Sequence, residues 1–294
     1  MGLRVAAISD LHVDFPENEA ATASVAAALV EADPDVVIVA GDVSPNARLL
    51  RDALAGFSAA APRALRLFVP GNHDVWCALG AEEGGAAASR AKYETAIPEV
   101  VRDAGFRALW ADGPLAHAGV GFCGTMGWYD YGFRADVFAD EPDDFFAKKR
   151  YGPLRWGDAR RARFGEDDRA VARRLEQDLA RDLGALAARK DVGAIVVVTH
   201  VLPYRDLVPY SRRGNAAWDY CCAFLGSPGL GRTIDEHGGG RVRLVVCGHI
   251  HVPTDRDLGG GKRAVIAPLG YPGKEWSGTP DAIARARLRV VDVG

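Results

Sequence analysis

The sequence predicts an α/β fold, and three observations support this prediction. Short apolar runs rich in β-branched residues recur along the chain without the polar alternation of a half-exposed strand, which favours strands covered on both faces. Alanine-rich helical patterns lie between the early runs. Polar residues of the kind that bind metal ions follow several of the runs directly. The predicted strands are 3–8, 36–40, 65–69, 194–199, 242–247, 264–267 and 284–293.

The first third of the chain alternates strands with helices. A helix is expected over 17–32, where alanine is abundant. A second helix is expected over 45–59, because Ser44 suits the N-cap position and Pro45 suits the first helical position. Strand, helix, strand, helix and strand in this order predict a parallel βαβαβ unit.

The later part of the chain is less regular. Three glycines at 259–261 predict a hairpin turn before the strand at Ala264, so the sheet should be mixed. A long helix is expected over 166–190. The segment 127–165 is rich in aromatic and basic residues and is either a cap that selects the substrate or an insertion with a small core of its own. The whole chain, 1–294, is otherwise predicted to be a single domain.

Composition limits the classes of function. With 48% hydrophobic and 26% charged residues the chain is typical of globular proteins. The net charge of −3 does not indicate binding to nucleic acid or an anionic membrane, although it is compatible with a local basic patch. No apolar run reaches the ~20 residues that cross a bilayer, and the first run is too short for a signal peptide, so a cytoplasmic protein is expected. Five cysteines without C-x-x-C spacing favour reduced thiols, with Cys221 and Cys222 as an alternative reactive pair.

Five short polar blocks stand at the ends of apolar runs. Five of the seven histidines lie in these blocks. The carboxyl ends of parallel strands meet at one edge of a sheet, so the blocks should lie together in space. The blocks are Asp10-Leu-His12, Gly41-Asp42, Gly71-Asn-His-Asp74, His200 and Gly248-His-Ile-His251.

The side chains in these blocks suit two cations rather than one. They offer two carboxylates, one amide oxygen and four imidazoles, and two ions could share the carboxylate of Asp42. Imidazole-rich sites favour manganese, iron or zinc, with nickel or cobalt as further candidates, over magnesium. Two divalent ions ~3.5–4 Å apart hold a bridging hydroxide and stabilise an in-line displacement. We therefore expect hydrolysis of a phosphate ester by that hydroxide.

Several further residues are candidates for contact with the substrate. His73 could neutralise phosphate charge and protonate the leaving group, with Asp74 fixing its orientation or raising its pKa. The alternative is that His73 only supports its neighbours. Tyr204, Arg205 and Tyr271 follow predicted strands and could contact the phosphate or the leaving group, although aromatic residues at such positions often just close a core.

Taken together, the five blocks resemble the calcineurin-like metallophosphoesterase superfamily, whose pattern is D-x-H, G-D, G-N-H-[DE], a later H, and G-H-x-H. The resemblance covers residues 10 to 251. It implies a four-layer α/β/β/α sandwich of two mixed sheets flanked by helices, and it gives His73 the role of acid. It also implies one metal held by Asp10, His12, Asp42 and His251, and another held by Asp42, Asn72, His200 and His249.

Departures from subfamily patterns narrow the expected function. Purple acid phosphatases place a tyrosine where this chain has Pro45, and serine/threonine protein phosphatases differ after Asp42 and at Asp74. The chain looks closer to the bacterial phosphodiesterase and small-molecule phosphatase branches. We expect a small-molecule monoester or diester as substrate, with nucleotides among the candidates. The alternatives are a nuclease of the same superfamily, which needs a basic groove, and a non-catalytic interaction scaffold.

Overall fold

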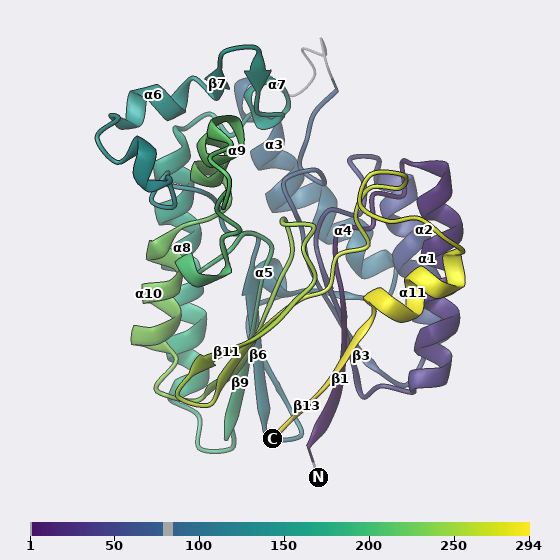
Figure 1. Cartoon of the computed structure of the whole chain (residues 1–294). Helices are drawn as coiled ribbons and strands as arrows, with labels where there is room; N and C mark the ends of the chain where they lie inside the picture. Colours follow the sequence, from purple (N-terminus) through teal and green to yellow (C-terminus); the bar gives the residue numbers. More distant parts are fainter. Residues whose placement is uncertain (1, 79–84) are drawn as a thin grey trace.

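Two mixed β-sheets packed face to face form the centre of the molecule (Figure 1). The computed structural model describes residues 2–78 and 85–294. In the first sheet β1 to β4 are parallel, and the last strand pairs with β1 in the antiparallel sense. Its strands, in spatial order, are β13 (Arg289–Val293), β1 (Leu3–Ile8), β2 (Val36–Ala40), β3 (Leu65–Val69) and β4 (Arg107–Ala108).

The second sheet is also mixed. Its inner strands are parallel, while the two edge strands run antiparallel to their neighbours. The spatial order is β11 (Thr254–Gly259), β12 (Lys262–Ile266), β10 (Val242–Cys247), β9 (Ala194–Thr199), β6 (Val120–Thr125) and β5 (Leu115–His117). The β11–β12 hairpin confirms the turn expected at the three glycines.

Helices cover the outer face of each sheet, which confirms the four-layer sandwich. In Figure 1, α1, α2 and α11 lie on one side, and α8 and α10 lie on the other. These flanking helices are α1 (Pro16–Ala32), α2 (Ala47–Ala60), α4 (Ile97–Asp103), α11 (Pro280–Arg287), α8 (Asp168–Ala187) and α10 (Pro228–His237). Short helices are α3 (Ala88–Ala91), α5 (Leu109–Asp112), α6 (Asp143–Ala147), α7 (Asp158–Arg161) and α9 (Ala216–Cys221). Single 3₁₀ turns at Gly85–Ala87, Asp136–Phe138, Arg205–Leu207 and Cys222–Phe224 and a π-helical turn at Lys92–Ala96 complete the helical elements.

Burial on both faces explains why the strand sequences lack polar alternation. On β2, Val36 and Ile38 face the second sheet, whereas Val37 and Val39 pack under the helices. Both sets are fully buried. Successive side chains of a strand point to opposite faces, so an inner strand of a four-layer fold must be apolar at every position.

The start of one helix and the assignment of two strands differ from the sequence prediction. The cap of α2 is Asn46, whose side chain accepts from the backbone N–H of Arg48 and Leu49, so the helix begins two residues later than the Ser44 and Pro45 pattern indicated. The expected strand 284–293 is half wrong, because Thr279 caps α11 and only the residues from Arg289 onward form a strand. Strand β6 was not predicted at all.

The segment 127–165 stands above the second sheet, beside α9 (Figure 1). It contains α6, α7 and a two-stranded pair, β7 (Arg150–Tyr151) with β8 (Leu154–Arg155). Trp128, Tyr129 and Phe146 are almost completely buried, so the segment has an apolar core. Trp156 is only partly buried and faces the cleft described below.

The five cysteines are all free and buried. Burial raises the pKa of Cys221 to about 11 and that of Cys222 to about 12, which disfavours the thiolate that a reactive pair would need. Within the described part of the chain, no helix is both long enough and apolar enough to cross a membrane.

Candidate dinuclear metal site

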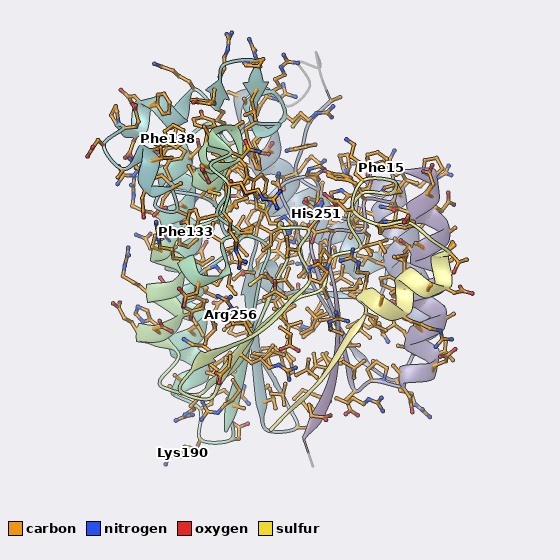
Figure 2. All side chains as sticks on the ribbon, in the orientation of Figure 1. Phe15, Phe133, Phe138, Lys190, His251 and Arg256 are labelled. Carbon is orange, nitrogen blue, oxygen red and sulfur yellow. The ribbon has the colours of Figure 1, made fainter. Side chains whose placement is uncertain are left out.

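The five polar blocks come together at one end of the sandwich. Each follows a strand of one of the two sheets, and these strands all end at the same edge. The first block is also bonded to the second sheet, because the N–H of Ser9 donates to the carbonyl of Ala267 at 2.9 Å. Figure 2 shows His251 between the two halves at this end of the molecule. The seven predicted ligands are therefore neighbours in space.

One group of donor atoms surrounds Asn72. Its Oδ1 lies 3.2 Å from Nε2 of His200 and 3.1 Å from Nδ1 of His249, and these two nitrogens are 3.2 Å apart. Oδ1 of Asp42 lies 3.4 Å from the same His200 nitrogen. These four residues are the set expected for one of the two ions.

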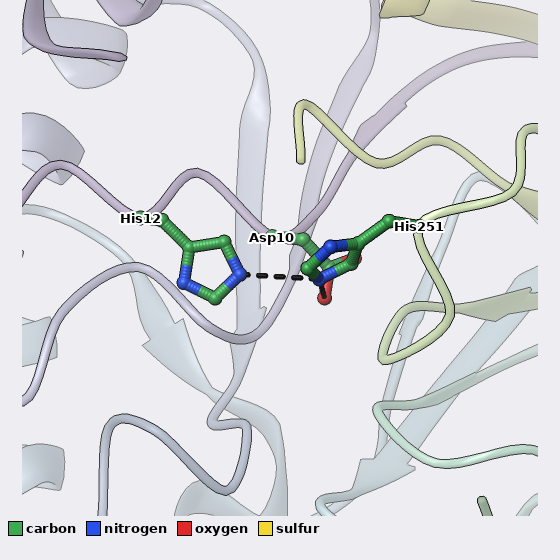
Figure 3. A group of neighbouring side chains, drawn as sticks. All are labelled: Asp10, His12 and His251. Carbon is green, nitrogen blue, oxygen red and sulfur yellow. Dashed lines mark hydrogen bonds and ion pairs between the residues drawn. The ribbon is translucent and has the colours of Figure 1, made fainter. Parts of the chain in front are cut away.

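A second group consists of Asp10, His12 and His251 (Figure 3). Nε2 of His12 is 3.2 Å from Nε2 of His251, which in turn is 3.5 Å from Oδ1 of Asp10. Ligand atoms of these three residues all lie within 4.8 Å of one another, as do those of His12 with Asp42 and His73. Asp42 thus connects the two groups, as a bridging carboxylate requires.

Three of the four ligand imidazoles have their other ring nitrogen fixed by an acceptor. Nδ1 of His200 is 2.9 Å from the carbonyl of Ala40, and Nε2 of His249 is 3.1 Å from that of Phe224. Nδ1 of His251 is 2.6 Å from Oε2 of Glu275. An N–H directed to each acceptor leaves the inward nitrogen with a lone pair for a cation. The donor set therefore fits metal binding.

His12 is the exception among these imidazoles. Its Nδ1 is buried and has no hydrogen-bond partner among the residues that the structure describes. Its Nε2 faces the cluster, and the ring stacks on Tyr271 with centroids 4.5 Å apart and planes 26° apart. Packing by an aromatic ring, rather than a hydrogen bond, orients this ligand.

In the metal-free site, the negative carboxylates are balanced by protonated imidazoles, and a bound metal would change the protonation of these imidazoles. Burial acts to raise the pKa of Asp42, but the imidazoles of His200 and His73 outweigh it and hold the pKa well below its ordinary value. Burial acts to lower the pKa of His200 and of His251, yet neighbouring carboxylates raise these values to about 9 and about 10. Without metal, protons on these two imidazoles balance the carboxylates; a bound cation would replace them.

The backbone of the site is strained at four of the seven predicted ligands. The φ angles of Asp10, His12, Asp42 and His249 are 53°, 43°, 55° and 70°. Residues other than glycine seldom adopt this left-handed conformation, which costs of order 1–3 kcal/mol at each position. The turns redirect the chain directly after a strand and so point the side chains inward.

Two glycines permit the close approach of these turns. A Cβ on Gly71 would lie 2.1 Å from Oδ1 of Asp42, and a Cβ on Gly41 would lie 2.5 Å from the nitrogen of Gly71. Neither atom could be accommodated without moving the Asp42 carboxylate or the backbone. The glycines before Asp42 and Asn72 are thus required by packing.

Asp74 has other partners than those expected from the sequence. Its two carboxylate oxygens accept hydrogen bonds of 2.7–2.9 Å from the backbone N–H groups of Gly71, Asp42, Val43 and Ser44. Among the described residues none of its hydrogen bonds joins His73. The expected role of Asp74 in orienting His73 is therefore corrected: this side chain ties the second polar block to the third.

His73 lies at the cleft side of the cluster. Its ring stacks on Trp76, with centroids 3.5 Å apart and planes 26° apart, and its Nε2 is 3.8 Å from Oδ2 of Asp42. Burial lowers the pKa of His73 to about 3, although Asp42 acts in the opposite direction. The ring is consequently neutral in the free protein, and it is not the imidazolium that the sequence suggested.

A cleft of about 430 Å³ opens over the cluster. Tyr271 lines it, whereas Tyr204 and Arg205 are not among the lining residues. The hydroxyl of Tyr204 donates to Asp235 at 2.9 Å, and Arg205 pairs with Asp136 at 2.6 Å. The lining residues are Asp42, Asn72, His73, Trp76, Trp156, Gly157, Trp218, Leu225, His249, Ile250, His251, Val252, Tyr271 and Glu275.

Sequence reasoning missed several residues of this site. Asp158 and Glu275 contact predicted ligands from 86 and 24 residues away in sequence, and neither belongs to a spaced motif. Trp156, between β8 and α7, and Trp218, on the short helix α9, also line the cleft. Two of these residues carried a usable signal: Trp76 follows a predicted site residue by three positions, and Trp156 belongs to the aromatic segment 127–165.

Comparison with known proteins identifies the class. The family model of the calcineurin-like phosphoesterases matches residues 3–253, so the chain belongs to this family. Among solved structures, phosphopantetheinyl hydrolase of Mycobacterium tuberculosis is similar, with a TM-score of 0.69 and 20% identity over 99% of this chain and 96% of that one. A dimetal phosphatase of Danio rerio has a TM-score of 0.51 and 12% identity over 90% and 86%. A search of curated protein sequences gave no match. At these identities the structural likeness shows the fold alone.

Proposed function

We propose that this protein hydrolyses a phosphate ester of a small molecule with two divalent metal ions. The observation that carries the proposal is the convergence of Asp10, His12 and His251 on one side of Asp42 and of Asn72, His200 and His249 on the other. When bound, the ions supply a water-derived nucleophile at neutral pH and stabilise the charge of an in-line displacement. The nitrogen-rich donor set favours manganese, iron or zinc.

We propose that His73 contacts the phosphate of the substrate and protonates the leaving group. Its neutral ring can donate an N–H to a phosphate oxygen, and the dianion that binds there raises its proton affinity. Once the ring has taken up a second proton from solvent, it can deliver that proton to the leaving oxygen and return to its neutral form. Trp76 restricts the ring to one plane by stacking. The contribution of Asp74 is indirect, through the loop that carries both His73 and Asn72.

The walls of the cleft indicate the kind of leaving group. Three tryptophans, Trp76, Trp156 and Trp218, line it together with Leu225 and Val252. No lysine or arginine is among its lining residues in the described part of the chain. A leaving group with a flat apolar surface and no further phosphate fits these walls, and one with several phosphates does not. We further propose that residues 127–165, which contribute Trp156, act as a cap.

Turnover assays test the proposal directly. Protein stripped with a chelator is reloaded with manganese, zinc or iron and assayed with p-nitrophenyl phosphate, its bis ester and cyclic nucleotides. Benzyl phosphate is then compared with ribose 5-phosphate, since both leave as primary alkoxides. We expect turnover that depends on metal and a kcat/KM at least tenfold higher for benzyl phosphate, about 1.4 kcal/mol of preference. Absence of metal-dependent turnover on every ester would refute the proposed function.

Two other functions are distinguished by simple measurements. A nuclease would bind DNA in a salt-dependent manner, but the net charge is −3 and the cleft walls are aromatic. A non-catalytic scaffold would hold less than one ion per chain and turn over neither nitrophenyl ester. Neither alternative is favoured by an observation in this structure.

A further inference from the structure

One buried carboxylate joins the segment 127–165 to the metal site. Asp158, the first residue of α7, is completely inaccessible to solvent. It accepts hydrogen bonds from Asn72 Nδ2 at 2.9 Å and from Trp76 Nε1 at 2.6 Å on one oxygen. On the other oxygen it accepts from Tyr129 at 3.1 Å and Trp156 Nε1 at 2.8 Å. Three of these four donors belong to residues that line the cleft.

The four bonds suit an acceptor that has no proton to give. An ionised carboxylate accepts through both oxygens and donates nothing, so all four donors can be satisfied at once. An amide in the same place would turn an N–H toward two of them. The arrangement therefore selects aspartate over asparagine, although the two side chains are almost equal in size.

The bond to Asn72 determines which end of its amide faces the metal site. Because Nδ2 of Asn72 donates to Asp158, its Oδ1 is directed at His200 and His249, at 3.2 and 3.1 Å. A flipped amide would present N–H groups to the position of the cation. A hydrogen bond from behind is the usual means by which proteins orient a ligand oxygen.

The same carboxylate fixes two walls of the cleft. Trp76, held at Nε1, stacks on His73. Trp156, also held at Nε1, lies edge-on to His249 with centroids 5.9 Å apart and an interplanar angle of 70°. Both indoles therefore donate to Asp158, and each packs against a different imidazole of the site.

We propose that Asp158 is a positioning residue, which orients the Asn72 amide for metal binding and sets Trp76 and Trp156 as the walls that contact the leaving group. The proposal rests on the proposed function, because it takes Asn72 as a metal ligand. It also gives the segment 127–165 a direct effect on metal affinity. A packed insertion without this bond would have no such effect.

The test is the variant Asp158→Asn beside the control Asp168→Asn. Asp168 makes a similar set of bonds, accepting from Trp128 Nε1, from Tyr131 and from Lys149, but none of these partners lines the cleft. Metal-free wild type and both variants are titrated with Mn²⁺, and free Mn²⁺ is followed by its EPR signal. In Asp158→Asn we expect one of the two ions to bind about 10–100-fold more weakly. Asp168→Asn should bind both ions with the same affinities as the wild type.

A kinetic measurement separates positioning from general destabilisation. The kcat of Asp158→Asn should fall at stoichiometric Mn²⁺ and recover in part with excess Mn²⁺, because the weakened site refills. Two ions of wild-type affinity in Asp158→Asn would overturn the proposal for Asp158 and leave the proposed function intact. A wild type that binds no Mn²⁺ would overturn the proposed function, and this proposal with it.

The wild-type protein provides a second measurement if Asp158→Asn does not fold. The side-chain NH₂ signals of Asn72 are assigned in protein with ¹⁵N-labelled asparagine by their loss in Asn72→Asp. We expect these protons to exchange with D₂O much more slowly than those of Asn46, which caps α2 at the surface. Exchange of both side chains at the same rate would contradict a fixed amide and overturn the proposal.

Discussion

His73 and the ligand histidines differ in how their rings are held. Hydrogen bonds from the outer nitrogen fix His200, His249 and His251, whereas His73 is held by stacking on Trp76 and borders the cleft. Hydrogen bonds define one lone pair for a cation. Stacking leaves both nitrogens of His73 available, which is suited to a residue that must exchange a proton with the substrate.

Replacement of His73 tests this division of roles. His73→Ala should lower kcat by about 10²–10⁴-fold, the usual contribution of a positioned proton donor, while two ions remain bound. His117→Ala is the control, because His117 is exposed on β5 at the edge of the second sheet. The measurements are steady-state kinetics and metal content. Wild-type kcat in His73→Ala would remove this residue from the mechanism.

Proton release tests the charge balance of the free site. His200 and His251, with pKa values raised to about 9 and about 10, are protonated at pH 7.5 and must lose a proton to bind a cation. Metal affinity should therefore rise from pH 6.5 to pH 9. Calorimetric titration with Mn²⁺ in two buffers of different ionisation enthalpy should show release of more than one proton per chain. Equal heats in both buffers would disprove this account.

At the residue scale, the residues of the candidate metal site could be predicted, but the side chains that hold them in place could not. Asp10, Asp42 and His200 directly follow apolar runs, and parallel strands place such residues together. Glu275 and Asp158 act through contacts between distant segments, which leave no spacing in the sequence. The role of Asp74 was misassigned because adjacency to His73 suggested a bond, whereas the turn points the carboxylate at backbone amides.

At the element scale, the start of α2 gives a local test of the fold. Asn46 caps this helix by accepting from two backbone N–H groups. Asn46→Ala should lower the free energy of unfolding by about 1 kcal/mol, since those donors lose their partner. Asn46→Asp, which keeps an acceptor, should stay within about 0.5 kcal/mol of wild type. Urea unfolding of the metal-free protein measures both changes. Equal stability of all three proteins would contradict the assigned cap.

Two elements show where the sequence pattern was insufficient. Strand β6 was overlooked because glycines interrupt its apolar run. A Cβ on Gly124 would lie 2.7 Å from both the carbonyl of Val198 and the Cγ1 of Val69, so close packing between the sheets requires a residue that weakens the strand pattern. Near the C-terminus, the alanines of α11 and the apolar residues of β13 form one nearly continuous apolar pattern. The boundary between helix and strand at Arg289 was therefore missed.

At the scale of the whole molecule, the candidate metal site lies between the two sheets and takes residues from both. Asp10, His12, Asp42 and Asn72 lie on loops after strands of the first sheet, whereas the remaining three residues, His200, His249 and His251, lie on loops after β9 and β10 of the second. Cations that bind only the folded protein should stabilise it by mass action, by about 2.7 kcal/mol per site at a hundredfold excess over Kd. We therefore expect chelation to lower Tm by several degrees, measured by calorimetry, and to change it less in Asp42→Ala. An unchanged wild-type Tm would argue against bound metal.

The layered architecture was predictable because five polar blocks in a fixed order accompany one known fold. The shape of the cleft was not predictable. From composition alone, the aromatic residues of 127–165 could pack in a core or line the cleft. In the structure Phe146 is buried in the core, whereas Trp156 lines the cleft. Which side chain does which depends on contacts such as that between Trp156 and Asp158, and sequence periodicity does not encode these contacts.

Anomalous X-ray scattering from crystals soaked in Mn²⁺ would show whether the Asp42 carboxylate bridges two ions. We predict two peaks about 3.5–4 Å apart, one beside Asp10, His12 and His251 and the other beside Asn72, His200 and His249. Both should be within bonding distance of the Asp42 carboxylate. A single peak, or two peaks of which one lies away from Asp42, would contradict the account.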